Sequence, residues 1–282
     1  MTASIRKYTI NVPQSKLDKL KRRLDDYEWP TPLSDEPGWD YGTPQSDIKR
    51  FHTHWKDKFD WRAHERKLNE LPNFETTVNV DGFGDIDMHF LHYRCDNVKG
   101  AIPLLFVHGW PGSVLEGVKM VPMLQGDGGE KPAFHIVAPS LPNYVWSGPA
   151  LKRGFGIAKY AEACHKVMMN LGYEQYVVQG GDWGFLICRT LTHNYPKHVK
   201  GIHTNWSWAA EPKWTTENPK PEKYSEREMD QLKQGERWYP FGQGMQKDNK
   251  SNPIRPTPSS IFQIPRHILT PLLTVQAKVE AT

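Results

Sequence analysis

Strand-like and helix-like segments alternate along residues 102–204, and this order restricts the fold more than any other feature of the chain. Apolar, strand-like runs at 102–113, 134–144 and 175–180 are separated by helix-like segments at 114–124 and 157–172, and a further helical pattern begins at Gly184. The segment "GIHTNW" then closes the series as another strand. Strands connected through helices in this way form a mostly parallel sheet with helices on both faces. The sequence therefore predicts an α/β fold.

The residues before this region have a different pattern. An amphipathic helix is predicted over 15–27, with Ser15 as its N-cap, and a second helix over 48–59. Residues 74–80 and 88–93 alternate like two half-exposed strands around the turn "DGFGD", which predicts a hairpin. Prolines, tryptophans and charges fill the rest of 29–73 without a strand period, so this stretch is interpreted as a wrapping segment and not as an independent domain.

Composition excludes several classes of function. The chain of 282 residues carries a formal charge of +4 with both signs interleaved, so no basic stripe indicates nucleic-acid binding. Its start has no apolar signal region and no run approaches the length of a membrane span, which predicts a soluble, cytoplasmic protein. The three cysteines lack CxxC spacing, as expected for reduced thiols rather than for a disulfide framework or a zinc site.

The stretch "VVQGGDWG" places one carboxylate at the corner between a predicted strand and a predicted helix. Gly180, Asp182 and Gly184 form the G-x-D-x-G pattern of a nucleophile elbow, with aspartate at the position where serine is more familiar. The helix start beneath the turn adds N–H groups and a positive dipole end, which favour an ionised carboxylate. The plainer alternative is that Asp182 only caps the helix.

A second motif, "HGWPGS" at 108–113, follows the earlier strand 102–107 and favours the elbow interpretation. In hydrolases of this layout, one oxyanion-hole N–H comes from the residue after the nucleophile and another from a loop after an earlier strand. The backbone amides of Trp183 and Trp110 are the two candidates by that geometry.

The choice of aspartate indicates the class of substrate. A serine that attacks a saturated carbon would leave a stable ether, whereas a carboxylate leaves an ester that activated water can cleave. Asp182 therefore points to a strained or activated carbon that bears a leaving oxygen or halide.

Taken together, "VPQSKLDKLKRRLDDYEWP", "DWRAHERKLNELPNF", "HGWPGS" and "GGDWG" resemble the epoxide hydrolases of the α/β-hydrolase superfamily that carry an N-terminal meander, the microsomal-type and fungal soluble group. The resemblance covers roughly residues 5–245. It implies that Asp182 is the nucleophile, that Trp110 and Trp183 supply the oxyanion hole, and that Pro111 is the family's cis-proline. It also implies hydrolysis of a small apolar epoxide without metal or cofactor.

The resemblance ends after Met245. In the family, two tyrosines of a helical cap protonate the epoxide oxygen, and a histidine paired with an acidic residue activates water. The segment 224–245 resembles the start of the cap, but the base and the acid have no match here, and His267 is a weak candidate for the base because "IPRHILTP" lacks the family's context. The tail at 246–282 is expected to be loosely ordered and is interpreted as altered coding sequence.

The predicted layout is a meander at 1–95, the first part of an α/β-hydrolase core at 96–210, an incomplete cap at 211–245 and the divergent tail at 246–282. Two other functions stay open: a haloalkane dehalogenase, which also uses an elbow aspartate, and a non-catalytic remnant that binds apolar molecules. A homodimer stays open as well. His52, His54 and His64 lack a carboxylate at ligand spacing, so a polar helix face is preferred over a metal site.

Overall fold

The computed structural model describes residues 4–32, 38–39, 42–126, 132–206, 225–227 and 230. As far as they are described, residues 4–13 and 60–206 form one compact unit, and residues 14–59 belong to a second. The first unit holds the sheet and the elbow. The predicted cap, the tail and His267 lie outside the described residues, apart from isolated positions, and the predicted domain boundaries stay predictions.

The sheet of the first unit is mixed, with the order β1-β2-β3-β5-β4-β6-β7. Its strands are β1 (Ile5–Lys7), β2 (Asn73–Val80), β3 (Gly84–Tyr93), β4 (Ile102–Val107), β5 (Phe134–Pro139), β6 (Tyr176–Gly180) and β7 (Val199–His203). β4 pairs in parallel with β5 and β6, and β6 pairs in parallel with β7. The predicted parallel core is therefore confirmed, while β1, β2 and β3 join it as antiparallel strands.

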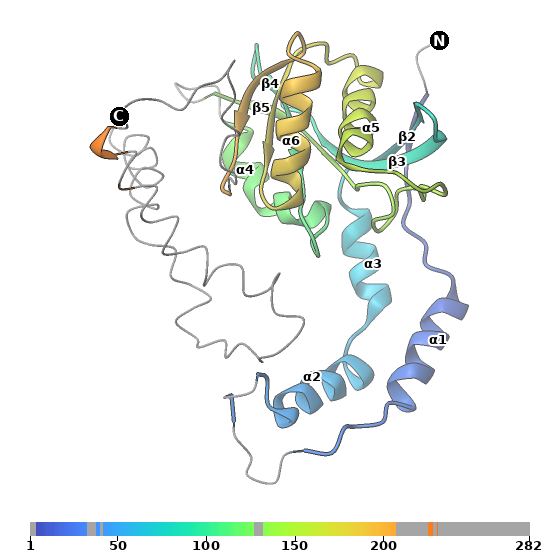
Figure 1. The fold of residues 1–282 in the computed structure, drawn as a ribbon. Coiled ribbons are helices and arrows are strands. Elements are labelled where there is room, and N and C mark those ends of the chain that lie inside the picture. The colour runs from blue at the N-terminus through green and yellow to red at the C-terminus, as the bar shows by residue number, and fades with distance from the viewer. Residues whose placement is uncertain are drawn as a thin grey trace. The chain divides into compact units, whose positions relative to one another are not determined.

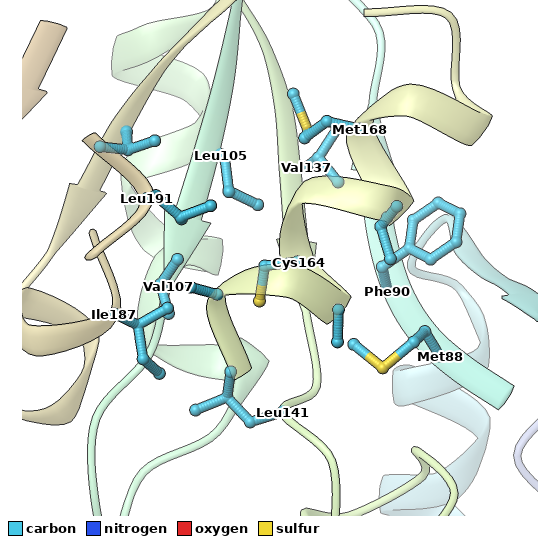
Figure 2. Close-up of a cluster of buried hydrophobic side chains, with 14 of the residues drawn as sticks. Met88, Phe90, Leu105, Val107, Val137, Leu141, Cys164, Met168, Ile187 and Leu191 are labelled. Carbon is cyan, nitrogen blue, oxygen red and sulfur yellow. The ribbon is translucent and has the colours of Figure 1, made fainter. Parts of the chain in front are cut away.

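Helices cover both faces of the sheet. Alternate side chains of β4 point to opposite faces, so this strand contributes to a buried cluster on each side. Leu105 and Val107 join the larger buried cluster, beneath α5 (Ile157–Asn170) and α6 (Trp183–Asn194). Figure 1 shows these two helices side by side against the sheet, and Figure 2 shows the cluster around Cys164 of α5 and Ile187 of α6. Leu104 and Phe106 face the other side, where the 3₁₀ helix η1 (Val114–Met120) and α4 (Val121–Leu124) pack.

The predicted hairpin is confirmed as β2 and β3, and the helix predicted over 157–172 as α5. The helix-like segment 114–124 differs from the prediction, since it divides into η1 and α4. Pro122 explains the division, because it lacks a backbone N–H and is tolerated only in the first turn of a helix, where it lies in α4.

A helix that the sequence did not predict, α3 (Trp61–Asn69), holds the segment that follows β1 by hydrogen bonds. Its buried residue is Glu65, whose Oε1 accepts the backbone N–H of Val12 at 2.7 Å. Asn69 accepts the N–H of Ile10 at 2.7 Å and donates to the carbonyl of the same residue at 2.9 Å.

The second unit contains α1 (Gln14–Asp25) and α2 (Gln45–Asp57), close to the predicted ranges 15–27 and 48–59. Lys56 of α2 pairs with Asp25 of α1 at 2.8 Å. His52 Nε2 donates to the carbonyl of Leu24 at 2.9 Å, so this side chain links the two helices.

Candidate active site

Asp182 lies on a sharp turn between the end of β6 at Gly180 and the start of α6 at Trp183. Its backbone has φ 52° and ψ −127°, a left-handed conformation that non-glycine residues rarely adopt. Such a conformation costs on the order of 1–3 kcal/mol and persists only where the surroundings enforce it.

Glycines allow the chain to close this tightly. A Cβ at Gly180 would lie 2.6 Å from the backbone carbon of Gly184, and a Cβ at Gly184 would collide with the carbonyl oxygen of Val107 on β4. A Cβ at Gly109, in the loop after β4, would lie 2.8 Å from the Cβ of Asp182. Only hydrogen fits at Gly180 and Gly184, where the end of β6, the start of α6 and the end of β4 are in direct backbone contact, whereas at Gly109 the close neighbour is the Asp182 side chain.

The side chain of Asp182 makes no capping hydrogen bond to α6. Its Oδ1 instead accepts the backbone N–H of Trp110 at 2.8 Å, across 72 residues of sequence. The capping alternative is therefore wrong, and the carboxylate faces the loop predicted to supply an oxyanion-hole donor.

Hydrogen bonds of the His108 side chain hold the loop that contains Trp110. This side chain is fully buried; its Nε2 accepts the N–H of Leu141 at 3.1 Å, so Nδ1 carries the proton and donates to the carbonyl of Gly109 at 2.9 Å. Burial lowers the pKa of His108, which keeps the ring neutral. The Trp110–Pro111 peptide bond is cis, as the resemblance implied.

Trp183, the second predicted donor, is the first residue of α6. The role of its amide in an oxyanion hole stays a prediction. Both tryptophans are exposed, Trp110 over 66% of its surface and Trp183 over 42%, so neither is part of the packed core.

A pocket of about 640 Å³ borders Asp182. Its apolar wall consists of Phe106, Trp110, Pro111, Met120 and Trp206, and its polar side chains are Glu116, Gln179, Asp182 and Asn205. Gln179 Oε1 is buried without a hydrogen-bond partner among the described residues, so it adds an unused acceptor at the pocket. A pocket with an apolar wall and a few polar groups is typical of small-molecule sites.

Two tyrosines near Asp182 were missed by the sequence analysis. Burial, then Tyr160, then the Asp182 carboxylate raise the pKa of Tyr144, and the ring of Tyr160 lies 6.5 Å from that of Trp183. The position of Tyr144 carried a usable signal, because the loop after β5 ends at the same sheet edge as the loops after β4 and β6.

No histidine of the described residues is placed as a base for Asp182: the pocket lining contains none, and both ring nitrogens of His108 are engaged in the loop. No cluster of three metal-binding side chains occurs in the part of the chain that the structure describes.

Two protein families match the chain. The family described as "alpha/beta hydrolase fold" matches residues 102–253, more than half of the chain. The chain belongs to the α/β-hydrolase family. This α/β hydrolase also matches "Epoxide hydrolase N terminus" over residues 5–117, which confirms the resemblance found in the sequence.

Named relatives of this α/β hydrolase are epoxide hydrolases. It is 33% identical to epoxide hydrolase 1 of Sus scrofa over 72% of this chain and 45% of the relative. It is 34% identical to juvenile hormone epoxide hydrolase 1 of Ctenocephalides felis over 74% of this chain and 44% of the relative. The chain thus spans about half the length of the relatives it matches.

Solved structures agree with the fold. The juvenile hormone epoxide hydrolase of Bombyx mori superposes with a TM-score of 0.65 at 33% identity, over 72% of this chain and 53% of that chain. The epoxide hydrolase of Aspergillus niger gives a TM-score of 0.65 at 27% identity, over 86% and 62%. Among the described residues, no helix has the length and apolar character needed to cross a bilayer.

Proposed function

We propose that this α/β hydrolase acts on a small apolar epoxide and that Asp182 attacks one of the ring carbons. The observation that carries the proposal is the hydrogen bond from the Trp110 amide to Asp182 Oδ1 at 2.8 Å. The Asp182 side chain makes this bond and no capping hydrogen bond to α6. The apolar wall of the adjoining pocket supports an apolar substrate.

The two oxygens of Asp182 take different roles in the proposed reaction. Oδ1 accepts a hydrogen bond and is the weaker nucleophile, so Oδ2 forms the new bond to carbon while the C–O bond of the epoxide breaks. The leaving alkoxide takes a proton from an acid and becomes a hydroxyl group. The product of this step is an ester on Asp182.

The second step is hydrolysis of that ester. Water attacks the ester carbonyl carbon and loses a proton to a base, while the negative charge develops on Oδ1, where the Trp110 N–H already points. Collapse of the intermediate breaks the bond between the carbonyl carbon and Oδ2, the leaving alkoxide takes back the proton held by the base, and the carboxylate is restored as the diol leaves. Loss of one oxyanion-hole donor costs roughly 10²–10³ in rate, so this amide is a large part of the proposed catalysis.

The described residues supply the nucleophile and one donor, whereas the base has no counterpart in the pocket lining. General-base and general-acid assistance are each worth roughly 10²–10⁴ in rate. With styrene oxide we therefore expect slow alkylation of Asp182 that persists as an ester, without sustained turnover.

Intact-mass spectrometry of the chain after incubation with styrene oxide tests this proposal. Asp182→Asn is a matched control, since the amide oxygen can still accept the Trp110 N–H. Equal alkylation of both proteins, or none of the wild type, contradicts the proposal. Sustained diol formation that Asp182→Asn abolishes would reveal a working base, with His267→Gln as the next variant. Halide release from a haloalkane without attack on the epoxide would favour the dehalogenase alternative.

A further inference from the structure

Glu116 is a second carboxylate at the pocket that contains Asp182. It belongs to η1 and follows the loop 108–113 directly in the sequence. Neither the predicted motif nor the proposed reaction assigns it a role.

Both oxygens of Glu116 face the backbone of the loop. Oε2 accepts the N–H of Gly109 at 3.4 Å, and Oε1 fills the place that a Cβ at Gly112 would occupy. The side chain therefore contacts the loop on either side of the Trp110–Pro111 peptide. A side chain at residue 112 would therefore displace the Glu116 carboxylate from the loop.

The start of η1 is itself anchored. Ser113 caps the helix by accepting the N–H of Leu115 on its Oγ at 3.3 Å, and its carbonyl accepts the N–H of Glu116 at 3.1 Å. Val114 is fully buried, and a Cβ at Gly117 would lie 3.1 Å from the ring of Phe106 on β4. Glu116 thus connects the loop to a part of the core that cannot shift easily.

His108 holds the carbonyl of Gly109 and Glu116 its N–H, and both matter for the Trp110 amide because the exposed Trp110 contributes little packing of its own. The geometry points to Glu116 as a positioning residue that holds the Trp110 N–H toward Asp182. Glu116 contacts the loop at Gly109 and Gly112, whereas Asp182 accepts the N–H of Trp110, so the two carboxylates have different partners. The catalytic meaning of this role rests on the proposed function, whereas the positioning itself does not.

Two substitutions in the full chain separate the negative charge of Glu116 from its hydrogen bond and its volume. Glu116→Gln keeps the size and an oxygen acceptor for Gly109, and Glu116→Ala removes both. Glu75→Ala is the control, since it removes a carboxylate that pairs with Arg6 on β1, away from the loop.

The first measurement observes the Trp110 amide directly. Selective ¹⁵N-tryptophan labelling with NMR detection follows this signal, and Trp110→Phe assigns it. We expect the signal to respond to Asp182→Asn, to shift in Glu116→Ala with at least tenfold faster hydrogen exchange, and to stay near the wild-type position in Glu116→Gln and Glu75→Ala.

The second measurement is the rate of alkylation by styrene oxide. A displacement of about 1 Å can cost on the order of 10² in rate, so we expect Glu116→Ala to be roughly 10- to 100-fold slower and Glu116→Gln to stay within about threefold. An unchanged Trp110 signal in folded Glu116→Ala would overturn the inference, as would a Gln variant as impaired as the Ala variant. If the wild type is not alkylated at all, the proposed function fails, while the amide measurement still decides the role of Glu116.

Discussion

Gly109→Ala is expected to disable the site without unfolding the protein. A Cβ at this position would lie 2.8 Å from Asp182 Cβ and 2.9 Å from Oδ1. Ordinary van der Waals contact begins near 3.4 Å, so the Asp182 side chain has to move by at least about 0.6 Å. That movement directly strains the hydrogen bond from Trp110 to Oδ1.

The size of the effect follows from how sensitive reaction rates are to geometry. Because a misplacement of about 1 Å can cost on the order of 10² in rate, we expect alkylation of Asp182 to slow by roughly 10- to 100-fold. The fold should survive, since the new methyl group meets a side chain and not backbone.

Time-resolved intact-mass spectrometry with styrene oxide in excess gives the rate, and a thermal melt checks folding. Gly156→Ala is the matched control: the nearest atom to its new Cβ is 4.0 Å away, so the alkylation rate should stay at the wild-type value, and the melt should change only by the loss of a glycine N-cap at α5. A folded Gly109→Ala protein that reacts within about threefold of the wild-type rate would refute the close contact between the loop and the carboxylate.

Two further predictions concern stability. Burial lowers the pKa of His89 from 6.5 to about 4, so the folded protein holds this ring neutral while the unfolded chain protonates it below pH 6.5. The free energy of unfolding therefore falls as the pH drops from 6.5 toward 4, and by pH 5 it has fallen by about 2 kcal/mol. Urea unfolding at pH 7 and pH 5 should show a smaller pH dependence for His89→Gln than for the wild type, and equal dependence would contradict the assignment. Gly184→Ala forces a methyl group against the carbonyl of Val107 on β4, so thermal melts should show a destabilisation of about 1–3 kcal/mol; a melting temperature like that of Gly156→Ala would disprove the contact.

Hydrophobic pattern predicted the elements whose buried side chains are apolar, and it failed where burial is polar. β4 and α5 are recognisable because residues such as Leu105 and Val167 recur at strand or helix spacing. α3 was missed although it is amphipathic, because its one buried side chain is Glu65, which Val12, Trp61 and Arg62 satisfy by hydrogen bonds. The N-cap Asp60, which accepts the Ala63 N–H, was a local signal for this helix.

The candidate site divides in the same way. Asp182 and Trp110 were predictable, because glycine spacing at the ends of two parallel strands places both at one sheet edge. Tyr144 carried only the signal of its place in the loop after β5, and Glu116 carried none, since its role depends on a contact with loop backbone that residue type alone does not specify.

The backbone at Asp182 also allows a test of whether function costs stability at this position. At φ 52° and ψ −127° an L-residue is strained, whereas glycine adopts such angles readily. Comparison of Asp182→Gly with Asp182→Ala isolates this effect, because both variants lose the carboxylate and the hydrogen bond from Trp110. Relief of strain should make the Gly variant more stable by about 1 kcal/mol in spite of its larger unfolded-state entropy, or roughly 2–4 °C in melting temperature for a domain of this size. A Gly variant that melts at or below the temperature of the Ala variant would mean that the backbone at residue 182 is not strained. The function of Asp182 would then carry no conformational cost in stability.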